Sequence, residues 1–213
     1  MLVVHEIYLS VQGESTYVGR PCVFVRLTAC DLRCRWCDTP YAFTGGTKMP
    51  VEAIVADVVR QRCSLVEITG GEPLLQPEVY ELMQRLLAGG HEVLVETGGH
   101  RSTERIPSGV VTILDVKCPA SGEAGRMHWP NLDRLRPRDE VKFVIQDRED
   151  FDYACDVVRR HDLTAKAAAV LFSPVHGVLA ADVLARWMLQ SGLPVRLQLQ
   201  AHKYIWSPEA RGV

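Results

Sequence analysis

The stretch Cys30-Asp31-Leu32-Arg33-Cys34-Arg35-Trp36-Cys37 is the most informative part of the sequence. It sets three cysteines at C-x3-C-x2-C spacing directly after the apolar, β-branched run Val23–Leu27, which predicts a strand. Three thiolates on one short loop can bind one face of a metal cluster but cannot supply four ligands. A 4Fe–4S cubane held this way keeps one iron open for a non-protein ligand, as an open catalytic metal site does.

Structural zinc is the main alternative for these cysteines, with Cys22 or a histidine as the fourth ligand. Zinc sites usually combine two C-x2-C pairs, and the sequence contains no second pair. The chain has seven cysteines, an odd number that cannot all be paired. With 213 residues it is also too large to need disulfide bonds for stability. A reducing compartment and a metal cluster are therefore the expectation.

Apolar runs of the same kind recur along the chain and predict further strands. They lie at Glu6–Leu9, Leu65–Ile68, Val93–Val95, Val110–Leu114, Val141–Ile145, Ala168–Phe172 and Val195–Leu199. Apolar positions at helical spacing follow Pro50 and Pro77 and recur within 151–158 and 183–188, which predicts helices there. Such alternation favours a parallel sheet that is buried on both faces.

These elements predict an α/β fold, a partial and open (β/α) barrel formed by a single domain over residues 1–213. A full eight-fold barrel typically takes ~250 residues, and this chain has about half the helical patterns that it would need. Residues 119–138 are rich in Gly, Pro, Arg and Asp and predict a long surface loop. Ligand sites of such folds lie at the carboxyl ends of the strands.

Composition excludes several classes of partner. Lys and Arg number 24 and Asp and Glu 26, so the formal charge of −2 argues against direct nucleic-acid binding. The longest apolar run, Ala167–Phe172, is far shorter than the ~18 residues that a membrane span needs. The first residues lack the features of a secretory signal, so we expect a cytoplasmic protein with no membrane partner.

A second motif, Gly70-Gly71-Glu72-Pro73, directly follows a predicted strand. Two glycines let a backbone come close to a ligand, and Glu72 offers a carboxylate to a cation. On its own this tetrapeptide is a common turn. After a cysteine loop and a crossover helix, it indicates a ligand site.

Two further positions carry chemistry, each with a simpler alternative. Arg26 lies inside an apolar strand, where a charge is costly unless it is paired, so it faces a carboxylate of the substrate or of the protein, such as Glu14. Asp38 and Thr39 follow the last cysteine and are oxygen ligands of the kind that Mg²⁺ accepts, although the following Pro40 also fits a simple turn.

The cysteine spacing, with an aromatic residue before the last cysteine, resembles the radical S-adenosylmethionine (SAM) superfamily. The resemblance implies that the amino and carboxylate groups of SAM bind the open iron. An electron from the cluster then cleaves SAM to a 5′-deoxyadenosyl radical.

The chain also resembles one family within that superfamily, the 7-carboxy-7-deazaguanine synthases, over nearly its whole length. The segments that carry this resemblance are Val11-Gln12-Gly13-Glu14, Phe24-Val25-Arg26, Cys37-Asp38-Thr39, Gly70-Gly71-Glu72-Pro73, Glu96-Thr97-Gly98-Gly99 and Gln200-Ala201-His202-Lys203. The family converts 6-carboxy-5,6,7,8-tetrahydropterin to 7-carboxy-7-deazaguanine and ammonia, on the route to queuosine-type 7-deazapurines of tRNA. The resemblance implies Mg²⁺, a homodimer and an electron donor such as flavodoxin or ferredoxin.

The resemblance also assigns residues, without any catalytic side chain of the protein. Cys30, Cys34 and Cys37 bind the cluster, and Thr39 binds Mg²⁺. The SAM contacts are Trp36, Cys37, Asp38, Gly71, Glu72, Asp115, Val116, Lys117, Ser173, Pro174 and Val175. The substrate contacts are Val11, Gln12, Gly13, Glu14, Arg26, Thr69, His202 and the terminal carboxylate of Val213, with Arg26 as the clamp on the substrate carboxylate.

Two other functions remain open at this point. An activase of a glycyl-radical enzyme shares the cysteine spacing but acts on a protein, whereas the early Gln12-Gly13-Glu14 with Arg26 favours a small carboxylated substrate. A non-catalytic metal-binding protein gives no reason for Gly70–Pro73 at a strand end. The colour of the purified protein and turnover of the carboxypterin distinguish the three.

Overall fold

One sheet of nine strands runs through the computed structural model, which describes residues 1–213. The strand order is β3-β1-β2-β4-β5-β6-β7-β8-β9. The strands are β1 (Leu2–Val11), β2 (Pro21–Leu27), β3 (Thr47–Met49), β4 (Leu65–Gly70), β5 (Glu92–Thr97), β6 (Val111–Asp115), β7 (Glu140–Ile145), β8 (Ala169–Pro174) and β9 (Arg196–Leu197).

The sheet is open, because β3 and β9 form its two edges and do not pair with each other. All neighbours from β2 to β9 are parallel, which confirms the predicted partial barrel. The first strand departs from the prediction of an all-parallel sheet, since β1 pairs antiparallel with both β2 and β3. Only residues 12–20 join β1 to β2, and a parallel pair needs a longer crossover. The strand predicted over Val195–Leu199 is shorter than expected, because β9 contains only Arg196 and Leu197.

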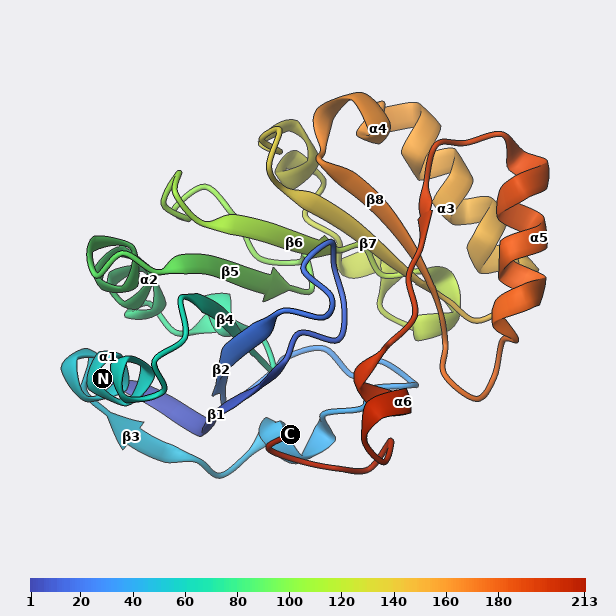
Figure 1. The fold of residues 1–213 in the computed structure, drawn as a ribbon. Coiled ribbons are helices and arrows are strands. Elements are labelled where there is room, and N and C mark those ends of the chain that lie inside the picture. Colours follow the sequence, from blue (N-terminus) through green and yellow to red (C-terminus); the bar gives the residue numbers. More distant parts are fainter.

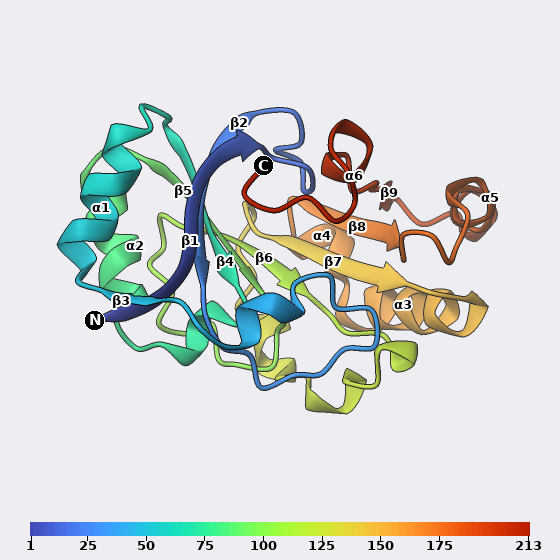
Figure 2. The ribbon, with the colours of Figure 1, turned by 90° about the horizontal axis from the view of Figure 1, so that it is seen from below.

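Helices cover the outer face of the sheet in two groups (Figures 1 and 2). α1 and α2 lie beside the first half of the sheet, and α3, α4 and α5 lie beside the second half. Their bounds are α1 (Val51–Arg60), α2 (Val79–Ala88), α3 (Arg148–His161), α4 (Leu163–Lys166) and α5 (Ala181–Ser191), and α6 (His202–Ile205) follows β9. The helices predicted after Pro50 and Pro77 are thus confirmed.

Two crossovers lack an α-helix, which explains why the chain is shorter than a full barrel. Residues 98–110 join β5 to β6 without any helix, and only short 3₁₀ turns within 119–133 lie between β6 and β7. The second connection is less superficial than predicted. Met127 and Leu132 are buried in the core, and the Asn131 amide donates hydrogen bonds to the Gly99 and Arg101 carbonyls at 3.0 and 2.8 Å. The loop therefore supports the residues that follow β5.

Alternation along the strands separates core from site, because successive side chains point to opposite faces. Apolar side chains on the outer face pack against α1 and α2 or against α3 and α5 in two large clusters. On the inner face, a small cluster closes the start of the strands, formed by Cys22, Phe24, Leu65, Leu94, Val111 and Ile113. Farther along, the inner face turns polar, and this is where the site lies.

No helix of the structure combines the length and the apolar character that crossing a membrane requires.

Candidate active site

A cavity of about 600 Å³ lies at the C-terminal ends of the parallel strands, and most of the predicted site residues line it. Its size is in the range of small-molecule sites. The C-terminal segment 206–213 lines the cavity as well, and Figure 1 shows it returning from α6 towards the turn at 40–43. There the Arg211 guanidinium lies 4.3 Å from the centre of the Tyr41 ring.

The cysteine loop forms one wall of the cavity. Cys30, Cys34 and Cys37 are free thiols, and all three line the cavity. Burial raises the pKa of each thiol, so a bound metal must displace three protons. No three His, Cys, Asp or Glu side chains converge on a point that would hold a single ion. A cubane does not require such convergence, because each cysteine binds a different iron.

The Gly70-Gly71 segment packs directly against the base of the cysteine loop. The amides of Gly71 and Glu72 donate to the carbonyls of Leu27 and Ala29, at 3.1 and 2.8 Å. A Cβ at Gly71 would lie 2.5 Å from the carbonyl carbon of Ala29 and 2.9 Å from Cys30 Cβ. The glycines therefore permit close contact between two loops as well as access to the cavity.

The Glu72 carboxylate, predicted to meet a cation, lines the cavity and already has hydrogen-bond partners within the protein. The side chain is fully buried and accepts hydrogen bonds from Leu74 N at 2.9 Å, Thr97 Oγ1 at 2.8 Å and Gly98 N at 2.9 Å. These donors come from the 3₁₀ turn Pro73–Leu75 and from the end of β5. Glu72 therefore joins the turn that follows the glycines to the end of β5.

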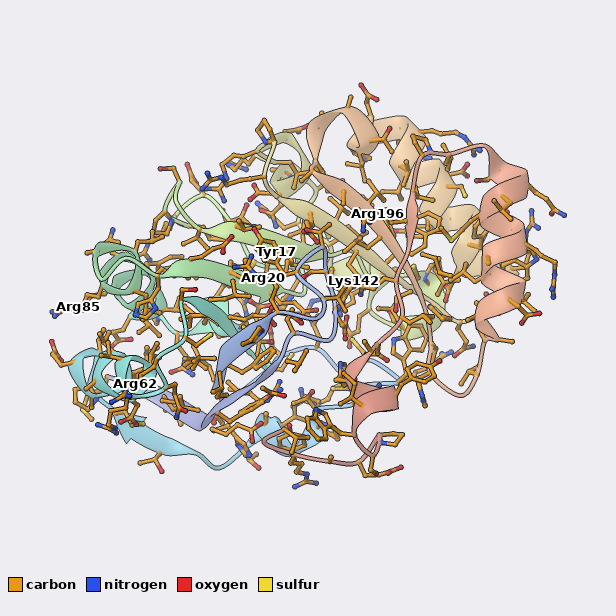
Figure 3. The ribbon with its side chains drawn as sticks, viewed as in Figure 1. Tyr17, Arg20, Arg62, Arg85, Lys142 and Arg196 are labelled. Atoms are coloured by element: carbon orange, nitrogen blue, oxygen red, sulfur yellow. The ribbon has the colours of Figure 1, made fainter.

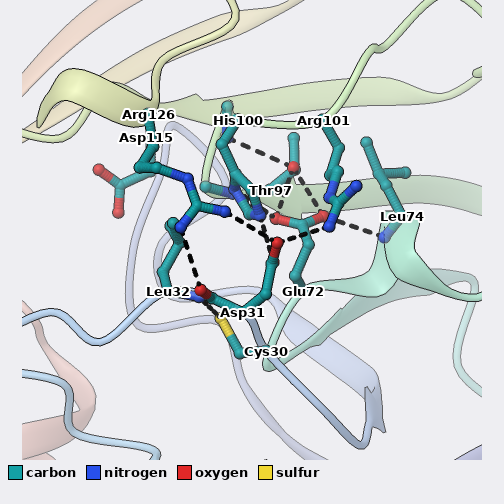
Figure 4. Close-up of polar contacts among 12 residues, drawn as sticks. Cys30, Asp31, Leu32, Glu72, Leu74, Thr97, His100, Arg101, Asp115 and Arg126 are labelled. Carbon is teal, nitrogen blue, oxygen red and sulfur yellow. Dashed lines mark hydrogen bonds and ion pairs between the residues drawn. The ribbon is translucent and has the colours of Figure 1, made fainter. Parts of the chain in front are cut away.

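A group of charged residues beside the cysteine loop connects it to the residues that follow β5 (Figure 4). Asp31, inside the cysteine motif, contacts His100 Nε2 at 2.6 Å, Arg126 at 3.1 Å and the guanidinium of Arg101. The other nitrogen of His100, Nδ1, lies 3.7 Å from Glu72 Oε2, and the side chain of His100 is only 3% exposed. His100 thus lies between the cysteine loop and the Gly-Gly-Glu-Pro loop.

Lys142 is the centre of a buried charge network inside the open barrel (Figure 3). Its ammonium contacts Glu14 Oε2 at 2.9 Å, Asp115 Oδ2 at 3.9 Å and the carboxylate of Glu96. Asp115 also pairs with Lys117 at 2.6 Å. These five residues come from the loop after β1, from β5, β6 and β7, and from the turn after β6, so the network joins both halves of the sheet.

Charge explains how the groups of this network ionise. Burial acts to raise the pKa of Glu14, but the Lys142 ammonium and the Gln200 amide outweigh it and hold that pKa below its usual value. Burial would lower the pKa of Lys142, but Glu14 and Glu96 together raise it well above its usual value. The lysine is therefore charged and Glu14 is ionised at neutral pH.

The loop after β1 is held from two directions. Gln12 Nε2 donates to Glu67, and Gln12 Oε1 accepts from the Glu14 amide at 3.0 Å. From the other side, Ala201 N donates to the Gly13 carbonyl at 2.9 Å, and a Cβ at Gly13 would lie 2.8 Å from His202 Cβ. The structure thus brings Gln12, Gly13, Glu14 and His202 together, as the substrate assignment requires.

Arg26 lines the cavity but already has a protein partner. Its Nε donates to Glu6 Oε1 at 2.7 Å, and one terminal nitrogen donates to the Tyr8 hydroxyl at 2.9 Å. Arg26 therefore pairs with an acidic residue of the protein, one of the two alternatives that the sequence left open. Its partner is Glu6 rather than Glu14. The second terminal nitrogen makes no hydrogen bond in the structure, so the guanidinium retains donors for a ligand carboxylate.

Asp38 and Thr39 lie at the mouth of the cavity. Asp38 Oδ2 pairs with Lys203 Nζ at 2.9 Å, and Thr39 Oγ1 donates to Asp38 Oδ1 at 3.1 Å. Burial acts to raise the pKa of Asp38, but Lys203 outweighs it and holds that pKa well below its usual value. Asp38 is therefore an ionised carboxylate beside a hydroxyl.

The structure places nearly all of the predicted site residues on this cavity, and three lie outside its lining. The cavity is lined by Val11, Gln12, Gly13, Glu14, Arg26, Cys30, Cys34, Trp36, Cys37, Asp38, Thr39, Thr69, Gly71, Glu72, Asp115, Lys117, Val175, His202 and Val213. Val116, Ser173 and Pro174 do not line it. Alternation turns Val116 towards the outer core, between the inward Asp115 and Lys117. Ser173 and Pro174 are buried within β8, and the cavity wall resumes at Val175.

Six charged residues that line the cavity were given no role from the sequence, namely Glu67, Glu96, Lys142, Lys203, Glu209 and Arg211. A signal was present for three of them, because Glu67, Glu96 and Lys142 lie in or directly after apolar runs. A charge in such a position is costly unless a partner or ligand faces it, the reasoning that identified Arg26.

Comparisons with known proteins agree with this geometry. The model of the radical SAM superfamily matches residues 25–163. The chain is 51% identical to a 7-carboxy-7-deazaguanine synthase of Koribacter versatilis over 224 aligned positions that cover 99% of both proteins. It is 43% identical to the protein of that name in Chlorobaculum tepidum, over 99% of this chain and 96% of that one.

Among solved structures, the crystal structure of QueE from Escherichia coli superposes with a TM-score of 0.78 at 22% identity. The superposition covers 94% of each chain and shows that the two share a fold.

Proposed function

The chain belongs to the 7-carboxy-7-deazaguanine synthases of the radical SAM superfamily, and from this premise we propose that it converts 6-carboxy-5,6,7,8-tetrahydropterin to 7-carboxy-7-deazaguanine and ammonia. The product is a 7-deazapurine of the queuosine type. One observation carries the proposal beyond the family name. The cysteine loop, the Gly70-Gly71 segment and a polar half with Arg26 line one cavity, so a cluster-bound cofactor and a carboxylated ring would meet there.

The residues present fit a 4Fe–4S cluster and SAM. Cys30, Cys34 and Cys37 would bind the cluster, and Gly71 leaves space beside Cys30 that a Cβ would fill. When bound, the cluster and SAM supply the one-electron cleavage that generates a 5′-deoxyadenosyl radical. The protein fixes the geometry of this half of the cavity through Glu72, which joins the turn that follows the glycines to the end of β5.

The opposite half of the cavity would bind the pterin. Arg26 would bind the substrate carboxylate through its free donors, and the loop of Val11, Gln12 and Gly13 would contact the ring through backbone groups. Glu14 and His202 lie beside that loop, and Thr69 projects from the end of β4. Hydrogen abstraction from C6 needs alignment rather than a protein base, so orientation by these residues carries the specificity.

Mg²⁺ would bind at Thr39, beside Asp38. A hydroxyl and an ionised carboxylate are ligands that this ion accepts. Asp38 now pairs with Lys203, so a cation at this point would compete with that ammonium. The proposed ion would therefore bind more weakly when Lys203 keeps its contact.

The remaining features of the proposal concern partners and setting. Residues 1–213 would act as a single domain, which one continuous sheet supports. The family resemblance supports a homodimer in the cytoplasm, with flavodoxin or ferredoxin as the electron donor and no membrane or nucleic-acid partner. Free thiols at all seven cysteines support a reducing compartment.

Product analysis tests the proposed function. The protein is reconstituted anaerobically with iron and sulfide and incubated with SAM, a reductant and the carboxypterin. We expect 7-carboxy-7-deazaguanine and 5′-deoxyadenosine together in the mass spectrum. Cleavage of SAM at a rate that the pterin does not change, without any deazapurine, would contradict the substrate and favour a protein substrate instead.

A further inference from the structure

Glu67 lies on the inner face of β4, on the floor of the cavity, and the reaction outlined above gives it no role. Its side chain lines the cavity, yet the residue is only 3% exposed. Its neighbours in register on the two adjacent strands are Phe24 and Leu94, both members of the small apolar cluster that closes the barrel. The carboxyl group thus stands where polar residues give way to apolar ones.

Glu67 has no Lys or Arg side chain in contact with it, unlike four other acidic residues of the cavity. Glu14 and Glu96 contact Lys142, Asp115 contacts Lys117, and Asp38 contacts Lys203. Only the uncharged amide of Gln12 contacts the Glu67 carboxyl group, at Oε2. The structure contains no hydrogen bond to Oε1.

The charges that face Glu67 disfavour its ionised form. Glu14 approaches from the loop after β1 and Glu96 from β5. Lys142 on β7 contacts both of them, and its charge acts to lower the pKa of Glu67 but is outweighed. Tyr8 on β1 and Cys22 on β2 also face it, and neither carries positive charge. Burial, and then repulsion by Glu96 and Glu14, raise the pKa of Glu67 well above its usual value.

We propose that Glu67 is a neutral carboxylic acid that determines substrate specificity, accepting the Gln12 amide at Oε2 and donating its proton from Oε1 to an acceptor atom of the bound heterocycle. A ring oxygen or nitrogen of a pterin is such an acceptor. The identity of that ligand rests on the proposed function, whereas the neutral state of Glu67 rests on the structure alone. A ring without an acceptor at this point would leave the acid proton unpaired in a dry pocket and bind less well.

Infrared spectroscopy tests the neutral state directly. The reconstituted enzyme, without SAM or substrate at neutral pH, should show the C=O stretching band of a protonated carboxylic acid. Glu67→Gln should lose one such band, and the control Glu104→Gln, at a carboxylate 71% exposed, should keep it. Identical spectra of wild type and Glu67→Gln would overturn the proposal.

Binding of the pterin tests the role. It is measured by calorimetry on the reconstituted enzyme with SAM and without reductant. Glutamine is neutral and keeps both an acceptor for Gln12 and a donor for the ligand, so Glu67→Gln should bind within about 3-fold of wild type. Glu67→Ala should bind about 10-fold more weakly, because it loses one hydrogen bond. Equal weakening in both variants would show that the ionised form is required and overturn the proposal.

The pH dependence adds a readout that a purely structural role would not change. Wild-type affinity should be constant below the raised pKa of Glu67 and fall about 10-fold per pH unit above it, because the donor proton is lost. Glu67→Gln should lack this decline, and the same slope in both proteins would overturn the proposal. A wild-type enzyme that binds no pterin would overturn the proposed function and this ligand, while the infrared band would still decide the state of Glu67.

Discussion

Replacement of Gly71 by alanine should separate the two loops that form the cofactor side of the cavity. A Cβ at this position would lie 2.5 Å from the carbonyl carbon of Ala29, whereas ordinary contact begins at 3.4 Å. The loops must therefore open by at least about 0.9 Å, the difference between these two distances, because the carbonyl oxygen of Ala29 would lie closer still. The atoms that resist are backbone of the cysteine loop, which cannot rotate away as a flexible side chain would.

The size of the effect follows from that opening. Overpacking of a tight contact costs about 1–3 kcal/mol, which lowers Tm by roughly 2–12 °C for a domain of this length. A misplacement of about 1 Å in an active site costs on the order of 100-fold in rate. Because the shift moves Cys30 relative to the glycine loop, turnover and the KM for SAM should both worsen.

The assay compares Gly71→Ala with Gly125→Ala, a matched control. Gly125 lies in an exposed turn beside Arg126, where an added Cβ meets nothing within 4 Å. Iron content after reconstitution, Tm and turnover are measured on both. If Gly71→Ala matches the control in all three, the close contact between the loops is not needed and the reasoning is refuted.

Three further predictions address the rest of the site. Arg26→Lys should raise the KM for the pterin about 10-fold with iron content retained, because the planar fork is lost; an unchanged KM would contradict the clamp. Asp31→Asn should speed iron release to a chelator, since His100, Arg101 and Arg126 lose their shared partner; wild-type release would contradict that role. Lys142→Met should lower the free energy of unfolding by about 3–5 kcal/mol at pH 7, because it leaves buried carboxylates without their cation. Without the Lys142 ammonium, the pKa values of those carboxylates should rise, so they become protonated as the pH falls towards 5. The difference in unfolding free energy between variant and wild type should then shrink. An equal difference at pH 7 and pH 5, measured by urea denaturation, would exclude this cause.

Local patterns in the sequence were enough to predict the parts of the site that are contiguous in the chain. The cysteine loop, the glycine loop and the segment around Gln12 each follow a strand, and strand ends in such a fold converge. The helices after Pro50 and Pro77 begin near the expected positions because their apolar spacing and their prolines agree.

Partners that depend on long-range pairing could not be predicted. Arg26 meets Glu6 only because β1 and β2 run antiparallel, in a register that no local pattern encodes. Lys142 reaches Glu14 across 128 positions of sequence. The hydrogen bonds from the end of β5 to Glu72 exist only because the folded strands are adjacent, so no local pattern predicts them.

The fate of the hydrogen at C6 of the pterin tests the central claim most directly, since that claim is one of alignment. The reconstituted enzyme is given SAM, a reductant and the carboxypterin carrying deuterium at C6. One deuterium should appear in 5′-deoxyadenosine, and the 7-carboxy-7-deazaguanine formed with it should have lost that deuterium. Unlabelled 5′-deoxyadenosine, formed without the deazapurine, would contradict the account.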